Sequence, residues 1–232
     1  MWSTVQVCLQ LAFNCLFYYP SGKAGRYSPP NTERGIMSNS EEDPMKKRDI
    51  GANTFVYPMP VTLLGTQVRG KANFMALGWL SRVNANPPMI GVAVGRHHLT
   101  CAGIAETGTF SINVPGEEMM EVTDYCGMVS GEKEDKSGIF EIFYGRLKTA
   151  PMIEECSLCM ECSLVKTMEF PANALFIGEI VASYSEEKYL SDNRPDITKM
   201  HPLLLTMPDN RYWKVGECAG KAWGEGRGFR KG

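Results

Sequence analysis

Short apolar runs separated by glycine, proline and asparagine dominate the sequence from residue 51 onward. Frequent punctuation of this kind is typical of a β-rich domain whose strands each span a few residues. Residues 89–95 (MIGVAVG) form the clearest early run, because Asn86-Pro87-Pro88 precedes it and a glycine closes it. Residues 110–114 (FSINV) alternate in polarity and stop at Pro115-Gly116. Both segments are predicted to be strands.

Other apolar runs extend the strand prediction along the chain. One or two strands are expected in residues 56–65, where Pro58 and Pro60 confine the start to an edge or a turn. Residues 72–82 are apolar on both parities, which predicts one strand that is buried or lines a site. Further strands are expected at residues 163–170, 175–185 and 201–205.

Two segments carry helix signals instead. Thr100 is placed to cap a helix over residues 101–107, and Gly108 is placed to end it. Residues 117–129 are predicted to form a second helix with acidic side chains in its first turn, where the helix dipole favours them. Six to eight short strands with two or three short helices indicate one closed, predominantly β domain, a β-barrel with a few short helices.

The first 44 residues do not share this pattern. Residues 5–19 are mostly apolar, but they are interrupted by Gln6, Gln10 and Asn14 and are too short for a membrane helix. A signal peptide requires a basic residue before its apolar run, and none precedes this one. Residues 20–44 are rich in glycine, proline, serine and asparagine, which predicts a linker or disorder.

A second interpretation of this segment comes from its codons. Glu33-Arg34-Gly35 can be encoded by a purine run that resembles a ribosome-binding site shortly before Met37. Translation is then expected to begin at Met37 or Met45, with residues 1–36 produced by a wrongly assigned start. The predicted organisation is an extension at residues 1–44, disordered or never translated, followed by one folded domain at residues 45–232.

Composition and charge narrow the class of protein. Of the 232 residues, 44% are hydrophobic and 22% are charged, which is enough for a sizeable core. The net charge of −2 excludes a nucleic-acid binder that relies on global charge, although a local phosphate site is compatible with it. Eight cysteines are too few for a disulfide-stapled miniprotein. Together with 14 methionines they indicate a reducing, cytoplasmic location without membrane attachment.

The most conspicuous spacing is a C-x2-C-x2-C run of Cys156, Cys159 and Cys162. An iron–sulfur cluster needs a fourth thiolate, and none follows closely. A zinc site would need a fourth ligand, for which the candidates are Cys126, Cys218, His97, His98 and His201. The alternatives are a redox-active thiol or three cysteines packed as small apolar side chains in a loop that leads into a strand. We favour packing and assign no metal ligand.

A basic turn supplies a different candidate site. Arg96, His97 and His98 directly precede the first predicted helix. A helix N-terminus offers free N–H groups and a positive dipole end, so Arg96, His98 and Thr100 are suited to hold one phosphate. The alternative is a solvated basic turn.

No motif supplies catalytic residues. The sequence contains no G-x-S-x-G elbow, no phosphate-binding G-x-x-x-x-G-K-[ST] loop and no H-E-x-x-H. We therefore assign no catalytic residue and expect a bound organic redox group to supply the chemistry.

A longer series of short motifs, in fixed order and spacing, resembles the flavin reductase-like family of FMN-binding split barrels, with flavoredoxins the most similar members. The similarity spans about three-quarters of the chain, from residue 53 to residue 223. Its members are Asn73-Phe74-Met75-Ala76, Trp79, Ser81-Arg82-Val83-Asn84, Asn86-Pro87-Pro88-Met89, residues 96–100, residues 108–115, Cys126-Gly127, Ser130-Gly131 and Asp135-Lys136.

The resemblance implies a split barrel with Greek-key order, a homodimer, and one FMN per subunit near the dimer interface. Positions that match cofactor-binding positions of the family have separate expected roles. Asn73 and Trp79 are expected beside the flavin, and the backbone of Ser81, Arg82, Val83 and Asn84 along the ring edge. Arg96, His98 and Thr100 match the turn that takes the phosphate.

Two loop positions complete the comparison with the family. Lys136 matches a lysine that reaches the cofactor, where a positive charge would favour the reduced, anionic flavin; the alternative is a solvated loop charge. Many relatives have a histidine shortly before the strand that contains F-I-G-E. This chain has Asn173 there, which cannot change charge near neutral pH as histidine can.

The expected function is that of an FMN-binding oxidoreductase or electron-transfer protein of the flavoredoxin and flavin reductase type. Its electron donor is NAD(P)H or another protein, and because no NAD(P)H motif stands out we favour electron transfer slightly. Two alternatives stay open: an NAD(P)H-dependent FMN reductase proper, and a metal-binding protein built on the cysteine run. A split barrel that has lost FMN and serves as a dimeric scaffold is a third. With either donor, we favour an enzyme, a flavin-dependent oxidoreductase.

Overall fold

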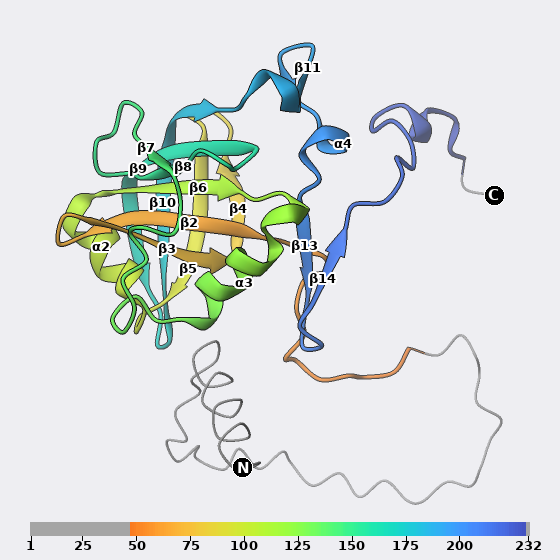
Figure 1. Ribbon diagram of the computed structural model, residues 1–232. Coiled ribbons are helices and arrows are strands. Elements are labelled where there is room, and N and C mark those ends of the chain that lie inside the picture. The colour runs from red at the N-terminus through yellow and green to blue at the C-terminus, as the bar shows by residue number, and fades with distance from the viewer. Residues whose placement is uncertain (1–46, 231–232) are drawn as a thin grey trace, which may run out of the picture. The chain divides into compact units, whose positions relative to one another are not determined.

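The computed structural model describes residues 47–230 (Figure 1). The predictions for residues 1–44 and for the start codon lie outside these residues. The chain divides into two compact units, residues 1–56 and 57–232. The described part of the first unit, residues 47–56, contains no helix or strand. Among residues 47–230, no helix has the length and apolar character needed to cross a membrane.

A seven-stranded antiparallel sheet forms the body of the second unit, in the spatial order β3-β2-β6-β9-β10-β5-β4. Three hairpins build most of it: β2 with β3, β4 with β5, and β9 with β10. The strands are β2 (Thr62–Val68), β3 (Lys71–Leu77), β4 (Leu80–Asn84), β5 (Met89–Gly95), β6 (Thr109–Val114), β9 (Leu158–Glu169) and β10 (Asn173–Tyr184).

The sheet curls into a barrel because its two edge strands are consecutive in the chain. In a flat sheet, β3 and β4 would lie six strand spacings apart, about 29 Å. Only Gly78 and Trp79 connect them, and two residues bridge about 10 Å at most. The edges must therefore approach each other at this corner, where the barrel stays open between β3 and β4.

Two helices flank the barrel. Helix α2 (Leu99–Thr107) connects β5 to β6 and packs mainly on β2. It ends where Gly108 adopts a left-handed φ of 66° and its N–H bonds to the carbonyl of Ile104, as glycine permits. Helix α3 (Met120–Met128) follows the 3₁₀ helix η1 (Glu117–Met119) and packs on β3.

Alternating side chains of the strands feed two apolar clusters. One, the barrel core, contains Leu64, Val92, Phe110, Cys162 and Phe176, among others. The other, the outer core, contains Leu63, Phe74, Cys126, Cys156 and Cys159, among others. Leu63 and Leu64 are neighbours on β2 but belong to different clusters, as the two-residue period of a strand requires.

Smaller elements surround this body. A three-stranded sheet of β1 (Met59–Pro60), β13 (Leu203–Thr206) and β14 (Arg211–Lys214) is fastened to η1 and α3, because Lys214 pairs with Glu117 at 2.6 Å and Tyr212 donates to Asp124 at 2.9 Å. The remaining elements are β7 (Ile142–Phe143) with β8 (Met152–Ile153), η2 (Glu187–Tyr189), β11 (Leu190–Ser191) with β12 (Arg194–Pro195), α4 (Ile197–Met200) and η3 (Glu225–Gly228).

The predicted fold class, a predominantly β barrel with a few short helices, is confirmed. Several boundaries were wrong, and three of them bear on the site or on the cysteine run. Residues 72–82 form two strands rather than one, because the chain turns at Gly78-Trp79. Helix α2 begins at Leu99 with His98 at its N-cap, so Thr100 lies inside the first turn and does not cap it. Strand β9 begins at Leu158, so Cys159 and Cys162 lie in a strand and not in a loop before it.

Candidate functional site

The corner between β3 and β4 presents Trp79 to the surface. Its side chain is 40% exposed, which excludes full burial in the core. Its carbonyl accepts a hydrogen bond from the N–H of Ala93 at 2.9 Å, so it lies beside the end of β5. The backbone of Trp79 therefore lies beside β5, two residues before that strand ends at Gly95.

Strand β4 continues from this corner as an edge of the sheet. Ser81, Arg82, Val83 and Asn84 are all exposed, and β4 pairs with β5 alone. Within residues 47–230, its outward backbone groups consequently have no partner strand, which leaves N–H and C=O groups available to a ligand. The Arg82 side chain folds back along the chain, donating from Nε to the carbonyl of Asn84 at 2.7 Å.

The turn after β5 leads directly into helix α2. The N–H of His98 donates to the carbonyl of Gly95 at 3.0 Å, and the helix begins at Leu99. In the described part of the chain, no side-chain hydrogen bond caps its first turn. The N–H of Cys101 donates to the carbonyl of His98 at 3.0 Å, which leaves the N–H groups of Leu99 and Thr100 open to an anion, with the positive end of the helix dipole behind them.

Arg96 contributes less charge to this turn than the sequence suggested. Its side chain lies 3.4 Å from a carboxylate oxygen of Glu169 and 3.4 Å from the carbonyl of Phe170, both near the β9–β10 turn. Its backbone N–H donates to the carbonyl of Ala172 at 3.0 Å. Arg96 thus ties the turn to the β9–β10 hairpin, and its charge is partly balanced.

His98 is half-buried and does not act as a cation at neutral pH. Burial, together with the neighbouring charges of His97 and Lys136, lowers the pKa of its imidazole to about 4. A neutral imidazole can still donate or accept a hydrogen bond. The basic turn therefore carries one exposed, paired arginine instead of a cluster of positive charges.

Thr100 and Asn73 form a buried pair behind the turn. The Asn73 amide on β3 donates to the Thr100 hydroxyl on α2 at 3.0 Å, and the two residues are 6% and 1% exposed. The Thr100 hydroxyl keeps its own proton to donate elsewhere. The pair connects the open edge of the barrel to the first turn of α2.

Lys136 is buried at 3% exposure, so the interpretation as a solvated loop charge was wrong. Its ammonium donates to the carbonyl of Phe74 at 3.0 Å and to that of Cys126 at 2.9 Å. Burial lowers its pKa, whereas the nearby Cys126 thiol opposes that shift. The ammonium of Lys136 lies close enough to His98 to lower the pKa of its imidazole. It also bonds to the carbonyl of Phe74, the residue that follows Asn73 on β3.

Asn173 also lies beside the turn. It opens β10 directly opposite Gly95 of β5, and its carbonyl accepts from the N–H of Phe170 at 2.8 Å. Among the predicted site residues, the structure joins Arg96, His98 and Thr100 on one turn and connects Asn73 and Lys136 to it. Trp79 lies at the neighbouring corner, whereas β4 carries Ser81 to Asn84 progressively away from the turn, since Leu80 pairs with Val92 and Asn84 with Met89.

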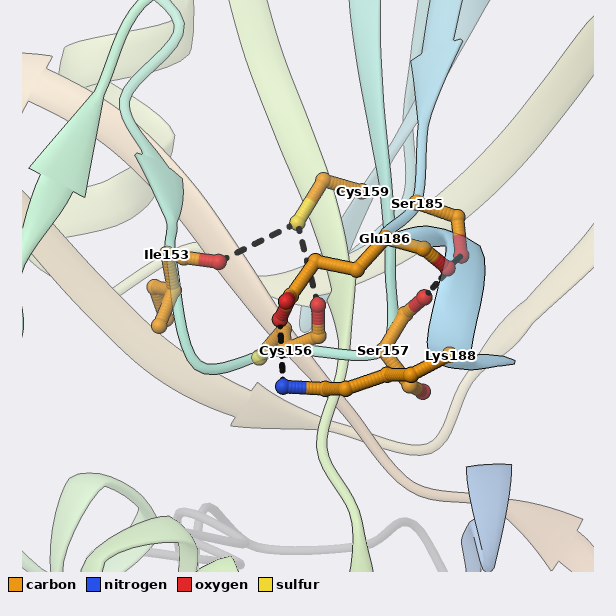
Figure 2. A network of polar contacts seen from close by, with 7 residues as sticks. All are labelled: Ile153, Cys156, Ser157, Cys159, Ser185, Glu186 and Lys188. Atoms are coloured by element: carbon orange, nitrogen blue, oxygen red, sulfur yellow. Dashed lines mark hydrogen bonds and ion pairs between the residues drawn. The ribbon is translucent and has the colours of Figure 1, made fainter. Parts of the chain in front are cut away.

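Two members of the cysteine run, Cys156 and Cys159, lie close together, and the Cys159 thiol points to the backbone carbonyls of Ile153 and Cys156 (Figure 2). The Cys159 thiol donates to the carbonyl of Ile153 at 3.3 Å, and the Cys156 thiol lies 3.9 Å from the sulfur of Met119. Burial raises the pKa of the Cys159 and Cys162 thiols to about 12. Around them, Ser185 donates to the carbonyl of Ser157 at 2.7 Å.

Strand parity explains why the run does not form a metal site. Cys159 and Cys162 are three residues apart on β9, so their side chains point to opposite faces. Cys159 lies with Cys156 in the outer core, and Cys162 lies in the barrel core. Within residues 47–230, no three histidine, cysteine or acidic side chains lie close enough to share a metal ion. The packing interpretation agrees with this arrangement, and the metal-binding alternative does not.

The sequence did not indicate two contacts around Asn73, that of the Phe74 carbonyl with Lys136 and that of Gly131 with Asn73. The Phe74 carbonyl, which accepts from Lys136, is a backbone group and leaves no signal in the residue type. Gly131 lies directly against Asn73, since a Cβ added to it would be 2.2 Å from Asn73 Oδ1. A glycine within the Ser130-Gly131 motif was the available signal, but nothing in the sequence indicates its neighbour.

Comparisons with known proteins agree with this geometry. A protein-family model described as a flavin reductase-like domain matches residues 54–207. The crystal structure of flavoredoxin from Methanosarcina acetivorans is 64% identical, has a TM-score of 0.78, and matches 78% of this chain and 98% of its own. Flavoredoxin of Desulfovibrio vulgaris (Miyazaki F) is 34% identical, with a TM-score of 0.74 over 78% of this chain and 100% of its own. A protein of Archaeoglobus fulgidus is 30% identical over 155 residues, 66% of this chain and 86% of its own.

Proposed function

The chain belongs to the flavin reductase-like family, and from that premise we propose that it is an FMN-binding electron-transfer flavoprotein of the flavoredoxin type. The observation that carries the proposal is the 64% identity to a flavoredoxin over 98% of that protein's length. The resemblance predicted from the sequence motifs is thereby confirmed. Bound FMN would supply the redox chemistry, accepting electrons from a donor and delivering them to an acceptor.

The residues of the candidate site fit such a group. The phosphate fits the uncapped first turn of α2, where the Thr100 hydroxyl and the leading N–H groups lie. The polar edge of the flavin ring fits the unpaired backbone of β4 at Ser81, Arg82, Val83 and Asn84. The exposed Trp79 side chain at the corner between β3 and β4 fits a wall for the planar ring.

Each group then has a defined task. The α2 turn holds the phosphate, Trp79 lies against the ring, and the β4 backbone, which leads away from the turn, orients the polar edge of the ring. Lys136 supplies a positive charge that burial leaves poorly screened. Such a charge favours an anionic ligand over a neutral one, whereas the neutral imidazole of His98 contributes hydrogen bonding and no charge.

The electron donor, the assembly and the location extend this proposal. We place the protein in the cytoplasm as a homodimer with one FMN per subunit, receiving electrons from a protein or from NAD(P)H. The six cysteines within residues 47–230 are all free, which suits a reducing compartment. Flavin reductase activity proper is the competing function, and a flavin reductase of Pseudomonas putida is 27% identical over 112 residues.

FMN titration tests the central proposal. Purified protein stripped of flavin should quench FMN fluorescence with one site per chain and an affinity tighter for FMN than for riboflavin. A chain that takes up neither flavin would refute the proposal and leave only a family fold.

Stopped-flow reduction of the FMN-loaded protein then identifies the donor. No bleaching by NADH or NADPH within seconds is expected for a protein that takes electrons from another protein. Fast bleaching by either nucleotide, with turnover of added flavin, would assign it as a flavin reductase instead.

A further inference from the structure

Lys136 connects three separate segments of the chain. It lies in the charged loop, residues 131–138, and its ammonium donates to the carbonyl of Phe74 on β3 and to that of Cys126 on α3. Within residues 47–230, no carboxylate forms an ion pair with it. Two carbonyl dipoles therefore hold a charge that burial alone would disfavour.

Two more contacts fasten the charged loop along β3. Asp135 pairs with Lys71 at 2.6 Å on the surface. At the other end of the loop, Gly131 lies so close to Asn73 that an added Cβ would clash with the amide oxygen at 2.2 Å. The loop thus contacts three positions of one strand, 71, 73 and 74, and the ammonium of Lys136 anchors it through a buried hydrogen bond.

Asn73 links the charged loop to helix α2. Its amide oxygen faces Gly131, and its amide nitrogen donates to the Thr100 hydroxyl in the first turn of α2. Any shift of the charged loop therefore acts on the side chain that sets the position of Thr100. No other described hydrogen bond holds the Thr100 hydroxyl.

We propose that Lys136 is a positioning residue: it clamps the charged loop on β3, so that Gly131, Asn73 and Thr100 hold the first turn of α2 in place for a phosphate. The proposal rests on the proposed function, because the phosphate is that of the flavin nucleotide. It differs from the direct contact with the cofactor expected from the family resemblance. Two of the three ammonium N–H groups are already committed to backbone carbonyls.

Lys136→Met tests the clamp, because it keeps the length of the side chain and removes its charge and its donors. FMN affinity should fall by about tenfold or more, whereas riboflavin affinity, which has no phosphate to lose, should change by less than about threefold. Lys133→Met is the matched control, since Lys133 lies exposed on the same loop, and it should bind both flavins as wild type does. An unchanged ratio of FMN to riboflavin affinity in Lys136→Met would overturn the proposal, even if the variant is less stable.

Gly131→Ala separates positioning from direct contact. It keeps Lys136 and its charge but pushes a methyl group against Asn73 and against Leu99, the first residue of α2, so the clamp predicts the same selective loss of FMN affinity, about threefold or more. Wild-type FMN affinity in Gly131→Ala would mean that the ammonium itself binds the ligand, and the positioning role would be rejected. This variant also carries the test if Lys136→Met does not fold. Failure of wild-type protein to bind FMN would instead refute the proposed function.

Discussion

Two buried regions of this barrel contain reactive side chains, and they use burial in opposite ways. The thiol run, Cys156, Cys159 and Cys162, is divided between two apolar cores, and its sulfur atoms meet carbonyls and a methionine. The polar network, Asn73, Thr100 and Lys136, joins a strand, a helix and a loop through hydrogen bonds. Residues that are closely spaced in the sequence therefore need not converge in space, and residues far apart in the sequence can.

Electrostatics separates the two regions as clearly as geometry does. Burial raises the pKa of each thiol in the run, so that these cysteines stay neutral and unreactive. Burial also lowers the pKa of Lys136, but two carbonyl oxygens accept from its ammonium. Burial makes the thiols of the run unreactive. In the polar network, Lys136 keeps its charge near the uncapped N-terminus of α2.

The largest expected effect concerns the thiols. At pH 8, a rise of the pKa from 9.0 to about 12 lowers the thiolate fraction of Cys159 about 10³-fold. Alkylation of native protein by iodoacetamide, followed by peptide mass spectrometry, should therefore label Cys218, which is exposed, at least about 10³-fold faster than Cys159 or Cys162. Comparable rates would show that the run is accessible, and the contrast between the two regions would fail.

One substitution in each region tests how much its packing contributes to the free energy of unfolding. Thr100→Val removes the acceptor of the Asn73 amide and leaves a buried donor without a partner, which should reduce the free energy of unfolding by about 1–3 kcal/mol. Cys162→Ser places a hydroxyl in the barrel core and should cost a similar about 1–3 kcal/mol. Urea denaturation measures both.

Flavin binding distinguishes the two variants although their stabilities are similar. Thr100→Val should also weaken FMN binding, because its hydroxyl lies at the α2 turn, whereas Cys162→Ser should bind FMN as wild type does. If Cys162→Ser loses FMN affinity as well, the thiol run contributes to the site after all.

The pH dependence of stability tests the burial of His98, which lies near the polar network. The His98 pKa is lowered from 6.5 to about 4, so the unfolded chain takes up a proton in this interval that the folded chain does not. Stability should therefore fall as the pH drops from about 6.5 to about 4, with a contribution of up to about one proton from His98.

Replacing the imidazole tests that contribution. Chemical denaturation at a series of pH values should give a shallower decline for His98→Gln than for wild type within that interval. His201→Asn is the matched control, because asparagine tolerates the left-handed backbone at this position, where φ is 45°. Equal declines for His98→Gln and wild type would mean that the imidazole is not buried.

Much of the fold followed from the sequence pattern. Residues 89–95 became β5 with both ends as predicted, and Gly108 ended α2 as predicted. The break at Gly78-Trp79 was missed because residues 72–82 are apolar on both parities. That pattern is shared by one long buried strand and by two strands that meet at a barrel corner, and only the pairing of β4 with β5 distinguishes them.

The members of the candidate site come from the sequence, whereas the contacts between them come from the fold. The motif series named Asn73, Thr100 and Lys136, yet the partners that fix Lys136 are carbonyl groups, which every residue possesses. The charge of the turn was overstated for a related reason. Sequence shows Arg96 beside two histidines, but it does not show that the β9–β10 hairpin brings Glu169 to the arginine.

Arg96 gives the smallest effect and tests that last point. If the exposed pair with Glu169 already engages the guanidinium, Arg96→Ala should weaken FMN binding by less than about fivefold, the range of a surface ion pair worth about 0.2–1 kcal/mol. Glu169→Gln should then tighten FMN binding slightly, because it releases the arginine toward the turn. Fluorescence titration at low and high salt measures both variants, since a screened charge loses its effect as salt rises. A loss of tenfold or more in Arg96→Ala would show that the arginine turns to the phosphate, and the exposed turn would then outweigh the buried lysine as the source of charge.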